Sequence, residues 1–236
     1  MARLDRLAAA REIAQIGAAL GRDFSHEMMA AVAQVPAHEL EAGLGRLVDA
    51  ELLVRHGEPP GAHYRFKHAL IRAPAYATLL RSHRHQLHAR IAAAMSTQKL
   101  SVVSATPEIL ARHYTEADLA HDAVPYWLQA GQRANARSAY VEAIAHCSKG
   151  LEVLKRLPDT REGAEQELAL CLALGTALVA TRGYAAREVE QVFARAPVVC
   201  AAVGHSVQRF RVIGGLCVYY EVGGAVRTAH ELAGEL

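Results

Sequence analysis

Apolar residues recur at helical spacing along almost the whole chain, and this period is broken in one short stretch before residue 69. Ile13, Ile16 and Leu20 fall on one face of a helix, and Leu40 with Leu44 repeats that spacing. After residue 68 the helical pattern returns and continues to the end. The chain is therefore predicted to be mostly α.

The stretch that breaks the helical period indicates a β-hairpin. An apolar run at 52–54 is followed by the turn Glu58-Pro59-Pro60-Gly61 and by alternating residues at 63–68. The alternation puts Tyr64, Phe66 and His68 on one face, which we predict to point inward. Three helices followed by a two-stranded hairpin form the winged-helix arrangement. An all-helical unit with a loop here is the alternative.

Large and small residues in the second half recur in the order of the tetratricopeptide (TPR) repeat, a pair of helices. In its 34-residue frame, the matches are Trp127, Gly131 and Ala143 at positions 4, 8 and 20, and Leu216, Tyr220 and Ala229 at positions 7, 11 and 20. Gly175 and Ala194 mark a unit between them, whose helices are separated by the loop 182–186. Small residues belong where paired helices pack closely.

These patterns predict three parts. A winged-helix-like domain with a small β-hairpin covers 1–68, a helical connector covers 69–117, and an α-helical TPR-like solenoid covers 118–236. The connector includes a Ser/Thr-rich linker at 96–106. A helical pattern begins almost at Met1 and another is still running at Leu236, so we expect the chain to be a fragment of a longer protein.

Composition narrows the classes of function. The chain has 236 residues, of which 52% are hydrophobic, and its net charge of +2 is unlike that of a strongly basic nucleic-acid binder. No apolar signal-peptide core follows the N-terminus. The longest uncharged apolar run, Leu168–Thr181, is short for a membrane span and is predicted to be a buried helix. The cysteines lie in apolar helical contexts and are predicted to be reduced, so we expect a cytoplasmic protein without membrane contact.

Several segments together resemble one protein family along nearly the whole chain. They are Arg11-Glu12-Ile13-Ala14-Gln15-Ile16-Gly17, Phe66-Lys67-His68-Ala69-Leu70-Ile71, Leu87-His88-Ala89-Arg90-Ile91, Tyr126-Trp127-Leu128-Gln129-Ala130-Gly131 and Gly183-Tyr184-Ala185. They are similar to segments of large bacterial STAND-type ATPases, many of which carry a class III adenylate or guanylate cyclase domain. The family order is effector, P-loop ATPase, winged helix and helical repeats. The resemblance implies that this chain holds the last two parts.

The resemblance also implies which chemistry lies outside this chain. A P-loop needs a Gly-Lys pair to hold nucleotide phosphates, and no such pair occurs in the sequence. We therefore expect no catalytic residue and no cofactor in this chain, with ATP or ADP bound by an upstream ATPase domain of the parent protein.

One site residue follows from the resemblance. In related STAND proteins a histidine just after the wing reaches the bound ADP and holds the resting state closed, and His68 has that place here. An imidazole near a diphosphate would gain a charge-assisted hydrogen bond. The commonest form of the motif has an acid at the next position, where this chain has Ala69. A core histidine bonded to the backbone is the alternative.

A second candidate is a basic stripe of Arg81, Arg84 and His88 at helical spacing, in a segment without acids. It could bind nucleic-acid phosphates or an acidic surface of the ATPase domain, or it could be a solvated helix face. His83 and His85 lie on different helix faces, so we predict no metal site.

Three hypotheses for the function remain. The first is a non-catalytic regulatory arm, in which a protein or peptide on the repeats shifts the nucleotide state of the ATPase domain. The second is a stand-alone TPR adaptor. The third is a winged-helix transcription regulator, which the acidic third helix (Glu39, Glu41, Asp49 and Glu51) argues against because acids repel DNA phosphates. Tyr184 is predicted to be exposed and to contact a partner.

Overall fold

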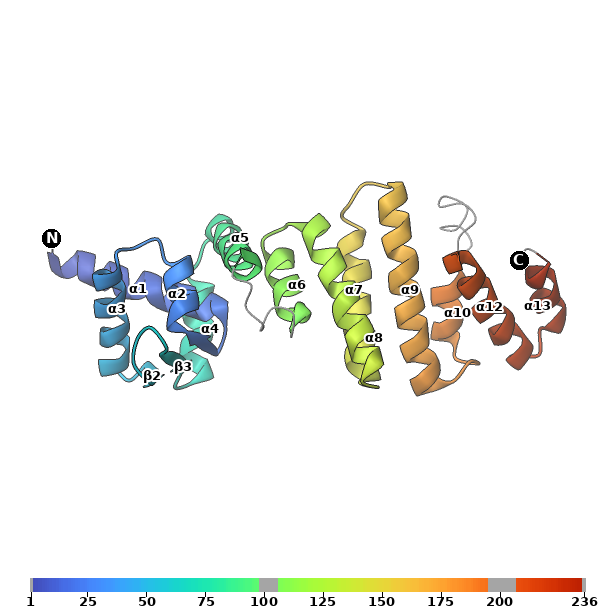
Figure 1. Cartoon of the computed structure of the whole chain (residues 1–236), viewed down its shortest axis with the longest axis horizontal. Coiled ribbons are helices and arrows are strands. Elements are labelled where there is room, and N and C mark those ends of the chain that lie inside the picture. The colour runs from blue at the N-terminus through green and yellow to red at the C-terminus, as the bar shows by residue number, and fades with distance from the viewer. Residues whose placement is uncertain (1, 98–105, 195–206, 235–236) are drawn as a thin grey trace. The chain divides into compact units, whose positions relative to one another are not determined.

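The computed structural model describes residues 2–97, 106–194 and 207–234, and Figure 1 draws its elements in chain order. Most of these residues are helical, and a small three-stranded antiparallel sheet accompanies the helices. The prediction of a mostly α chain is confirmed. The chain divides into two compact units, each described by itself. Unit 1 holds residues 1–103 and 116–118, and unit 2 holds residues 104–115 and 119–236.

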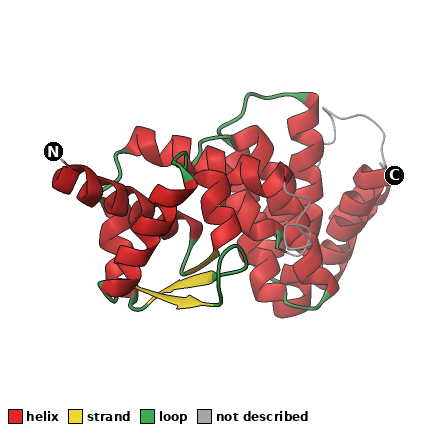
Figure 2. Ribbon diagram, turned by 60° about the vertical axis from the view of Figure 1, so that its left-hand side comes forward, coloured by secondary structure: helices red, strands yellow, loops and turns green. Residues whose placement is uncertain are grey.

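Unit 1 contains the predicted order of three helices followed by a hairpin. Its elements are α1 (Ala2–Leu20), β1 (Asp23–Ser25), α2 (His26–Val32), α3 (Ala37–Asp49), β2 (Leu53–His56), β3 (His63–Phe66), α4 (Ala69–Ala77) and α5 (Arg81–Thr97). The hydrophobic period does not predict β1, which is three residues long and pairs antiparallel with β3. The strand order is therefore β1-β3-β2, and the strands are yellow in Figure 2.

Side chains alternate along these strands, so the sheet has a buried and an exposed face. Tyr64 and Phe66 of β3 are buried as predicted, and Phe24 of β1 stacks on Tyr64 with ring centroids 5.7 Å apart. Exposed side chains in and beside the strands form three ion pairs, which are Arg65–Asp23, Lys67–Glu51 and Arg55–Glu58. Acids thus compensate the basic residues of the hairpin.

Two glycines let the helices of unit 1 approach its core closely. A Cβ at Gly17 of α1 would lie 2.9 Å from the ring of Phe24. A Cβ at Gly43 of α3 would overlap the end of the Ile13 side chain. Both distances are shorter than van der Waals contact, so α1 packs against the sheet and α3 as closely as it does because these positions lack a side chain.

The predicted connector 69–117 is divided between the units rather than forming a separate piece. Helix α4 packs against α1, and α5 packs against α1 and α2. Leu87 and Ile91 of α5 are buried in unit 1, whereas α6 contributes mainly to unit 2. The predicted linker at 96–106 lies mostly outside the described residues.

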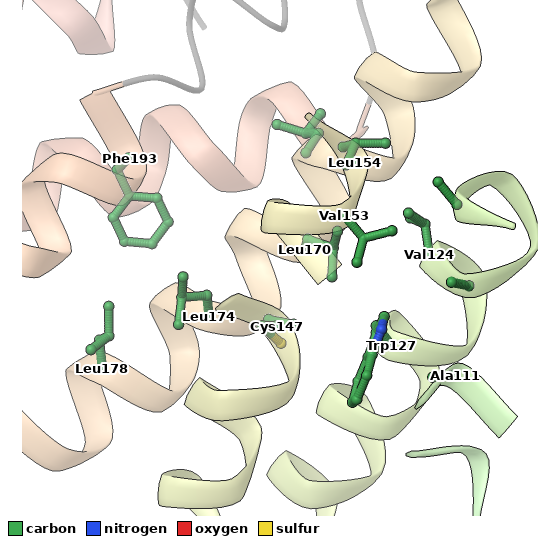
Figure 3. Close-up of a cluster of buried hydrophobic side chains, with 14 of the residues drawn as sticks. Ala111, Val124, Trp127, Cys147, Val153, Leu154, Leu170, Leu174, Leu178 and Phe193 are labelled. Carbon is green, nitrogen blue, oxygen red and sulfur yellow. The ribbon is translucent and has the colours of Figure 1, made fainter. Parts of the chain in front are cut away.

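Unit 2 is built from consecutive helices that pack on their neighbours. They are α6 (Pro107–Glu116), α7 (Ala120–Ala136), α8 (Tyr140–Leu154), α9 (Arg161–Arg182), α10 (Arg187–Ala194), α12 (Val207–Val222) and α13 (Val226–Ala233). One apolar core runs from α6 to α12. Figure 3 shows part of it, including Trp127 of α7, Cys147 of α8, Leu174 of α9 and Phe193 of α10.

Three helix pairs in unit 2 are joined by the same kind of turn. In each pair the second residue after the preceding helix has positive φ, namely Asp118 (60°), Ser138 (60°) and Gly224 (80°). The next N–H then donates to the carbonyl five residues back, as in Leu119 to Tyr114 (2.9 Å), Ala139 to Ala134 (2.8 Å) and Ala225 to Tyr220 (2.8 Å). These contacts define a Schellman-type helix end.

The helices after these turns also share the backbone conformation of their first residues. Their N-cap residues have nearly the same φ and ψ, which are −95° and 67° at Leu119, −83° and 62° at Ala139, and −90° and 54° at Ala225. Each helix carries a buried alanine four residues after its N-cap, at Ala123, Ala143 and Ala229. The turn and the helix start therefore recur as one local unit at α6–α7, α7–α8 and α12–α13.

The small residues expected at helix crossings lie at close contacts. A Cβ at Gly131 would overlap Cys147 Sγ, and a Cβ at Gly175 would overlap the Phe193 ring. A Cβ at Gly150, which the repeat pattern does not single out, would lie 2.8 Å from Leu170 Cδ2. The side chain of Ala194 lies outside the described ones.

Helix α9 contains the apolar run predicted to be buried. By length and composition, it is the one helix among the described residues that could cross a membrane. Its apolar residues pack in unit 2 instead, with Leu168, Leu170 and Leu178 almost fully buried. A core helix of this kind satisfies the same length and composition test.

Candidate functional site

His68 lies between the hairpin and α4, and the prediction that its side chain points inward is wrong. Strand β3 ends at Phe66, so the alternation of side chains stops before His68. His68 is instead the N-cap residue of α4, with φ −134° and ψ 140°, and its exposed side chain makes no capping hydrogen bond. The alternative of a core histidine is also excluded by this exposure.

The predicted basic stripe of Arg81, Arg84 and His88 is not a continuous basic surface. Arg81 is exposed, but Arg84 is half-buried and His88 is buried. The Arg84 guanidinium donates to the carbonyl oxygens of Leu79 (3.0 Å) and Ala77 (3.1 Å) at the end of α4. Arg84 thus satisfies the carbonyl of Ala77, in the last turn of α4, where helix carbonyls lack helical partners, and that of Leu79 just beyond the helix.

Tyr76 of α4 contacts both Arg84 and His88 of α5. Its hydroxyl lies 2.9 Å from Nε2 of His88, and the Arg84 guanidinium carbon lies 4.9 Å from the centre of its ring. Arg84 and His88 therefore hold α4 against α5. Helical spacing alone could not reveal these contacts, because it does not show which face of α5 packs against α4.

Helix α3 keeps the acidic character on which the argument against DNA binding depends. Glu39, Glu41 and Asp49 are exposed, while Arg46 in its last turn is half-buried. Nearby, the hydrogen bond from Lys67 holds the pKa of the Glu51 carboxyl below its usual range, so that carboxylate stays charged in mildly acidic solution.

Tyr184 lies in the loop between α9 and α10, and 41% of it is exposed. Gly183 before it has φ of 80°, a conformation that glycine adopts without strain. An ion pair between Arg182 and Glu188 joins the two sides of the loop. Tyr184 is thus an exposed aromatic residue on a loop whose ends are fixed.

Unit 2 also contains a cavity that the sequence did not reveal, and it is open to solvent at the molecular surface. Its volume is about 290 Å³, and it lies between α6, α7 and α8. The lining residues are Glu108, Ala130, Arg133, Ala136, Arg137 and His146. A spacing of four residues puts Arg133 and Arg137 one turn apart on α7, which the sequence could have indicated. No sequence spacing links Glu108 to these arginines, because Glu108 belongs to α6.

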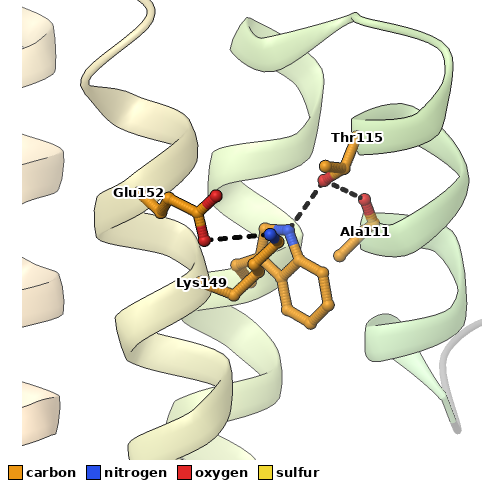
Figure 4. A network of polar contacts seen from close by, with 5 residues as sticks. Ala111, Thr115, Lys149 and Glu152 are labelled. Carbon is orange, nitrogen blue, oxygen red and sulfur yellow. Dashed lines mark hydrogen bonds and ion pairs between the residues drawn. The ribbon is translucent and has the colours of Figure 1, made fainter.

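Contacts with core residues fix the position of His146, which lines this cavity. The His146 ring stacks on Trp127, with centroids 5.7 Å apart. The indole N–H of Trp127 donates to Thr115 Oγ1 at 2.9 Å. Thr115 in turn donates to the carbonyl of Ala111 at 2.8 Å, and Figure 4 draws Thr115 and Ala111 with this contact. This chain of contacts fixes α6, α7 and α8 to one another.

The remaining candidate chemistry is limited. Burial raises the pKa of the Cys147 thiol to about 12, so this cysteine is a protonated core residue at neutral pH. Within residues 2–97, 106–194 and 207–234, no three His, Cys, Asp or Glu side chains come together as metal ligands.

Comparison with known proteins shows similarity to a distant relative. The chain is 27% identical over 192 residues to an uncharacterized protein of Rhizobium meliloti (strain 1021). The alignment covers 81% of this chain but only 19% of the relative, so the chain spans about a fifth of that protein's length. No protein-family model and no solved structure matches the chain.

Proposed function

We propose that the chain is a non-catalytic regulatory segment of a larger cytoplasmic signalling ATPase of the STAND type. In this proposal unit 1 is a winged-helix domain that docks on an upstream ATPase domain, which binds ATP or ADP. Unit 2 is a TPR-like repeat array that receives a protein or peptide. Partner binding favours an open state over a closed, ADP-bound state, because the partner binds the open state better.

In unit 2 one kind of turn recurs together with the same start of the following helix, and this recurrence is the observation that carries the proposal. Repeat arrays stack copies of one helix–turn–helix unit, and small residues let their helices approach closely. The shared turns at Asp118, Ser138 and Gly224, and the close contacts at Gly131 and Gly175, support the proposal that unit 2 is such an array. Repeat arrays of this kind commonly bind other proteins, so they support an interaction function.

The arrangement of unit 1 gives further support. Its order of helix, strand, two helices and hairpin supports the winged-helix part of the proposal, while the exposed acids of α3 disfavour DNA as its partner. The exposed position of His68, at the end of the hairpin, leaves its imidazole available to a separate domain. We therefore assign His68 the contact with ADP bound in the ATPase domain.

The test is binding of the 236-residue chain to the ATPase region that the proposal expects upstream in the same gene. Affinity is measured by calorimetry with ADP and with ATP, for the natural chain and for His68→Ala. His63→Ala is the matched control, because His63 is an exposed histidine of β3 in the same unit.

Tighter binding with ADP, weakened by His68→Ala and unchanged by His63→Ala, is the expected result. Equal affinity in both nucleotides removes the nucleotide-sensing role. A gene without an upstream P-loop ATPase, or a folded chain that does not bind that region, favours the stand-alone adaptor.

A further inference from the structure

The cavity between α6, α7 and α8 combines charges of both signs within a small volume. Arg133 and Arg137 line it from α7, and Glu108 lines it from α6. Ala130 and Ala136 also line it, and their small side chains leave room for a ligand. From this arrangement we propose that the cavity binds a free α-amino acid, with its carboxylate at the arginines and its ammonium group at Glu108.

The arginine side of the cavity suits a carboxylate. A guanidinium offers paired N–H donors that match the two oxygens of a carboxylate. Arg137 already has a carboxylate partner, Glu142 at the start of α8. Both side chains of this ion pair are more than half exposed, and exposed pairs contribute little to stability. A ligand carboxylate can therefore replace Glu142 at small cost.

Glu108 distinguishes an amino acid from a simple anion. It is half-buried, and it forms no hydrogen bond or ion pair with any residue in the part of the chain that the structure describes. An acidic peptide side chain in the cavity would face this carboxylate without compensating it. An ammonium group next to the ligand carboxylate compensates it directly.

Size and rigidity agree with a small ligand. The volume of about 290 Å³ is at the lower limit of ligand pockets, which commonly measure 300–1,000 Å³. His146 is held against Trp127, and Trp127 is held by Thr115. The cavity therefore does not depend on a loop for its shape. The inference goes beyond the proposed link to an ATPase, and this chain alone is sufficient to test it.

The experiment adds the standard L-α-amino acids, one at a time, to the 236-residue chain and follows binding by saturation-transfer NMR. Each amino acid that gives a signal is titrated beside its N-acetyl derivative and its methyl ester. At least one amino acid is expected to bind, and removing either charge is expected to weaken binding by about ten-fold or more.

Variants locate the site. Arg137→Gln and Glu108→Gln are each expected to weaken binding by about ten-fold. Arg112→Gln is the matched control and is expected to bind like the natural chain, because Arg112 is exposed on α6 but does not line the cavity. Circular dichroism melts show whether each variant is folded, and Arg137→Lys, which keeps the charge, is expected to bind with intermediate affinity.

Three results would overturn the proposal. One is that no amino acid gives a signal with the folded chain. Another is that binding survives both Arg137→Gln and Glu108→Gln unchanged. The third is that an N-acetylated, C-amidated tripeptide with a central glutamate binds more tightly than any amino acid, which would assign the cavity to acidic peptides. None of these results bears on nucleotide-dependent docking of unit 1.

Discussion

Single residues in unit 2 set how closely its helices can approach. Gly131 of α7 faces Cys147 of α8, and no side chain fits between them. The repeat pattern in the sequence identifies Gly131 because small residues recur at fixed positions. It does not identify Gly150, whose Cβ would lie 2.8 Å from Leu170 Cδ2, because Leu170 belongs to α9, outside the pair of helices that the pattern joins.

Replacing Gly131 with alanine is expected to destabilise unit 2 by about 1–3 kcal/mol, because the new methyl group overlaps Cys147 Sγ. Gly214→Ala is the matched control in a helix of the same unit. A Cβ there meets nothing within 4 Å, so this change is expected to stabilise by about 0.5–1 kcal/mol through helix propensity. Urea unfolding followed by fluorescence of Trp127 measures both, and equal effects would contradict the packing account.

The Cys147 thiol is expected to resist alkylation in the native chain. Its pKa of about 12 leaves a very small thiolate fraction at pH 8, and the thiolate is the reactive form. Iodoacetamide labelling at pH 8, read by mass spectrometry of the peptide that contains Cys147, should be slow in buffer and fast in urea. The native rate is expected to rise with pH up to the folded-state pKa. Rapid native labelling at pH 8 would show that Cys147 is not buried.

Secondary structure was predictable where a local period determines it. The helices and the hairpin have clear apolar periods, whereas β1 has three residues and depends on pairing with β3, about forty positions later. His68 was placed wrongly because the alternation was extended past Phe66, where β3 ends. The cavity residues could not be grouped, because Glu108 and His146 come from helices separated by α7.

The end of α4 provides a prediction for unit 1. Arg84→Ala is expected to lower its stability by about 1–2 kcal/mol, since the guanidinium satisfies carbonyl oxygens of Leu79 and Ala77. Arg81 lies at the exposed start of α5, the helix that also carries Arg84. Arg81→Ala is expected to change the stability of unit 1 by less than about 0.5 kcal/mol. Thermal unfolding followed by circular dichroism compares them. Equal losses of stability in the two variants would mean that the hydrogen bonds from Arg84 to the end of α4 do not stabilise unit 1.

The recurrent turn of unit 2 gives a second prediction for an element. Ser138 has φ of 60°, which is unfavourable for a residue with a Cβ and favourable for glycine. Ser138→Gly is therefore expected to stabilise unit 2 by about 1 kcal/mol, as glycine does at the equivalent Gly224. Ser148→Gly, inside α8 and exposed, is expected to destabilise by about 0.5 kcal/mol. Urea unfolding that shows the same sign for both changes would argue against the turn geometry.

For the whole molecule, the chain combines two units with different features. Unit 1 carries a hairpin with compensated charges and an exposed His68 at its end, and unit 2 carries repeated turns and a charged cavity. A regulatory segment needs both a surface for the domain it controls and a receptor for a signal. The relative in Rhizobium meliloti, of which this chain matches only 19%, shows that a similar segment occurs within a much longer protein.

The central claim is that this chain docks on an ATPase domain according to the bound nucleotide. The most direct measurement is the ratio of its dissociation constants for that domain with ATP and with ADP, determined by calorimetry at one salt concentration. The account predicts a ratio of about ten or more in favour of ADP, corresponding to about 1.4 kcal/mol of coupling. A ratio of one, with tight binding in both states, would contradict nucleotide-dependent docking.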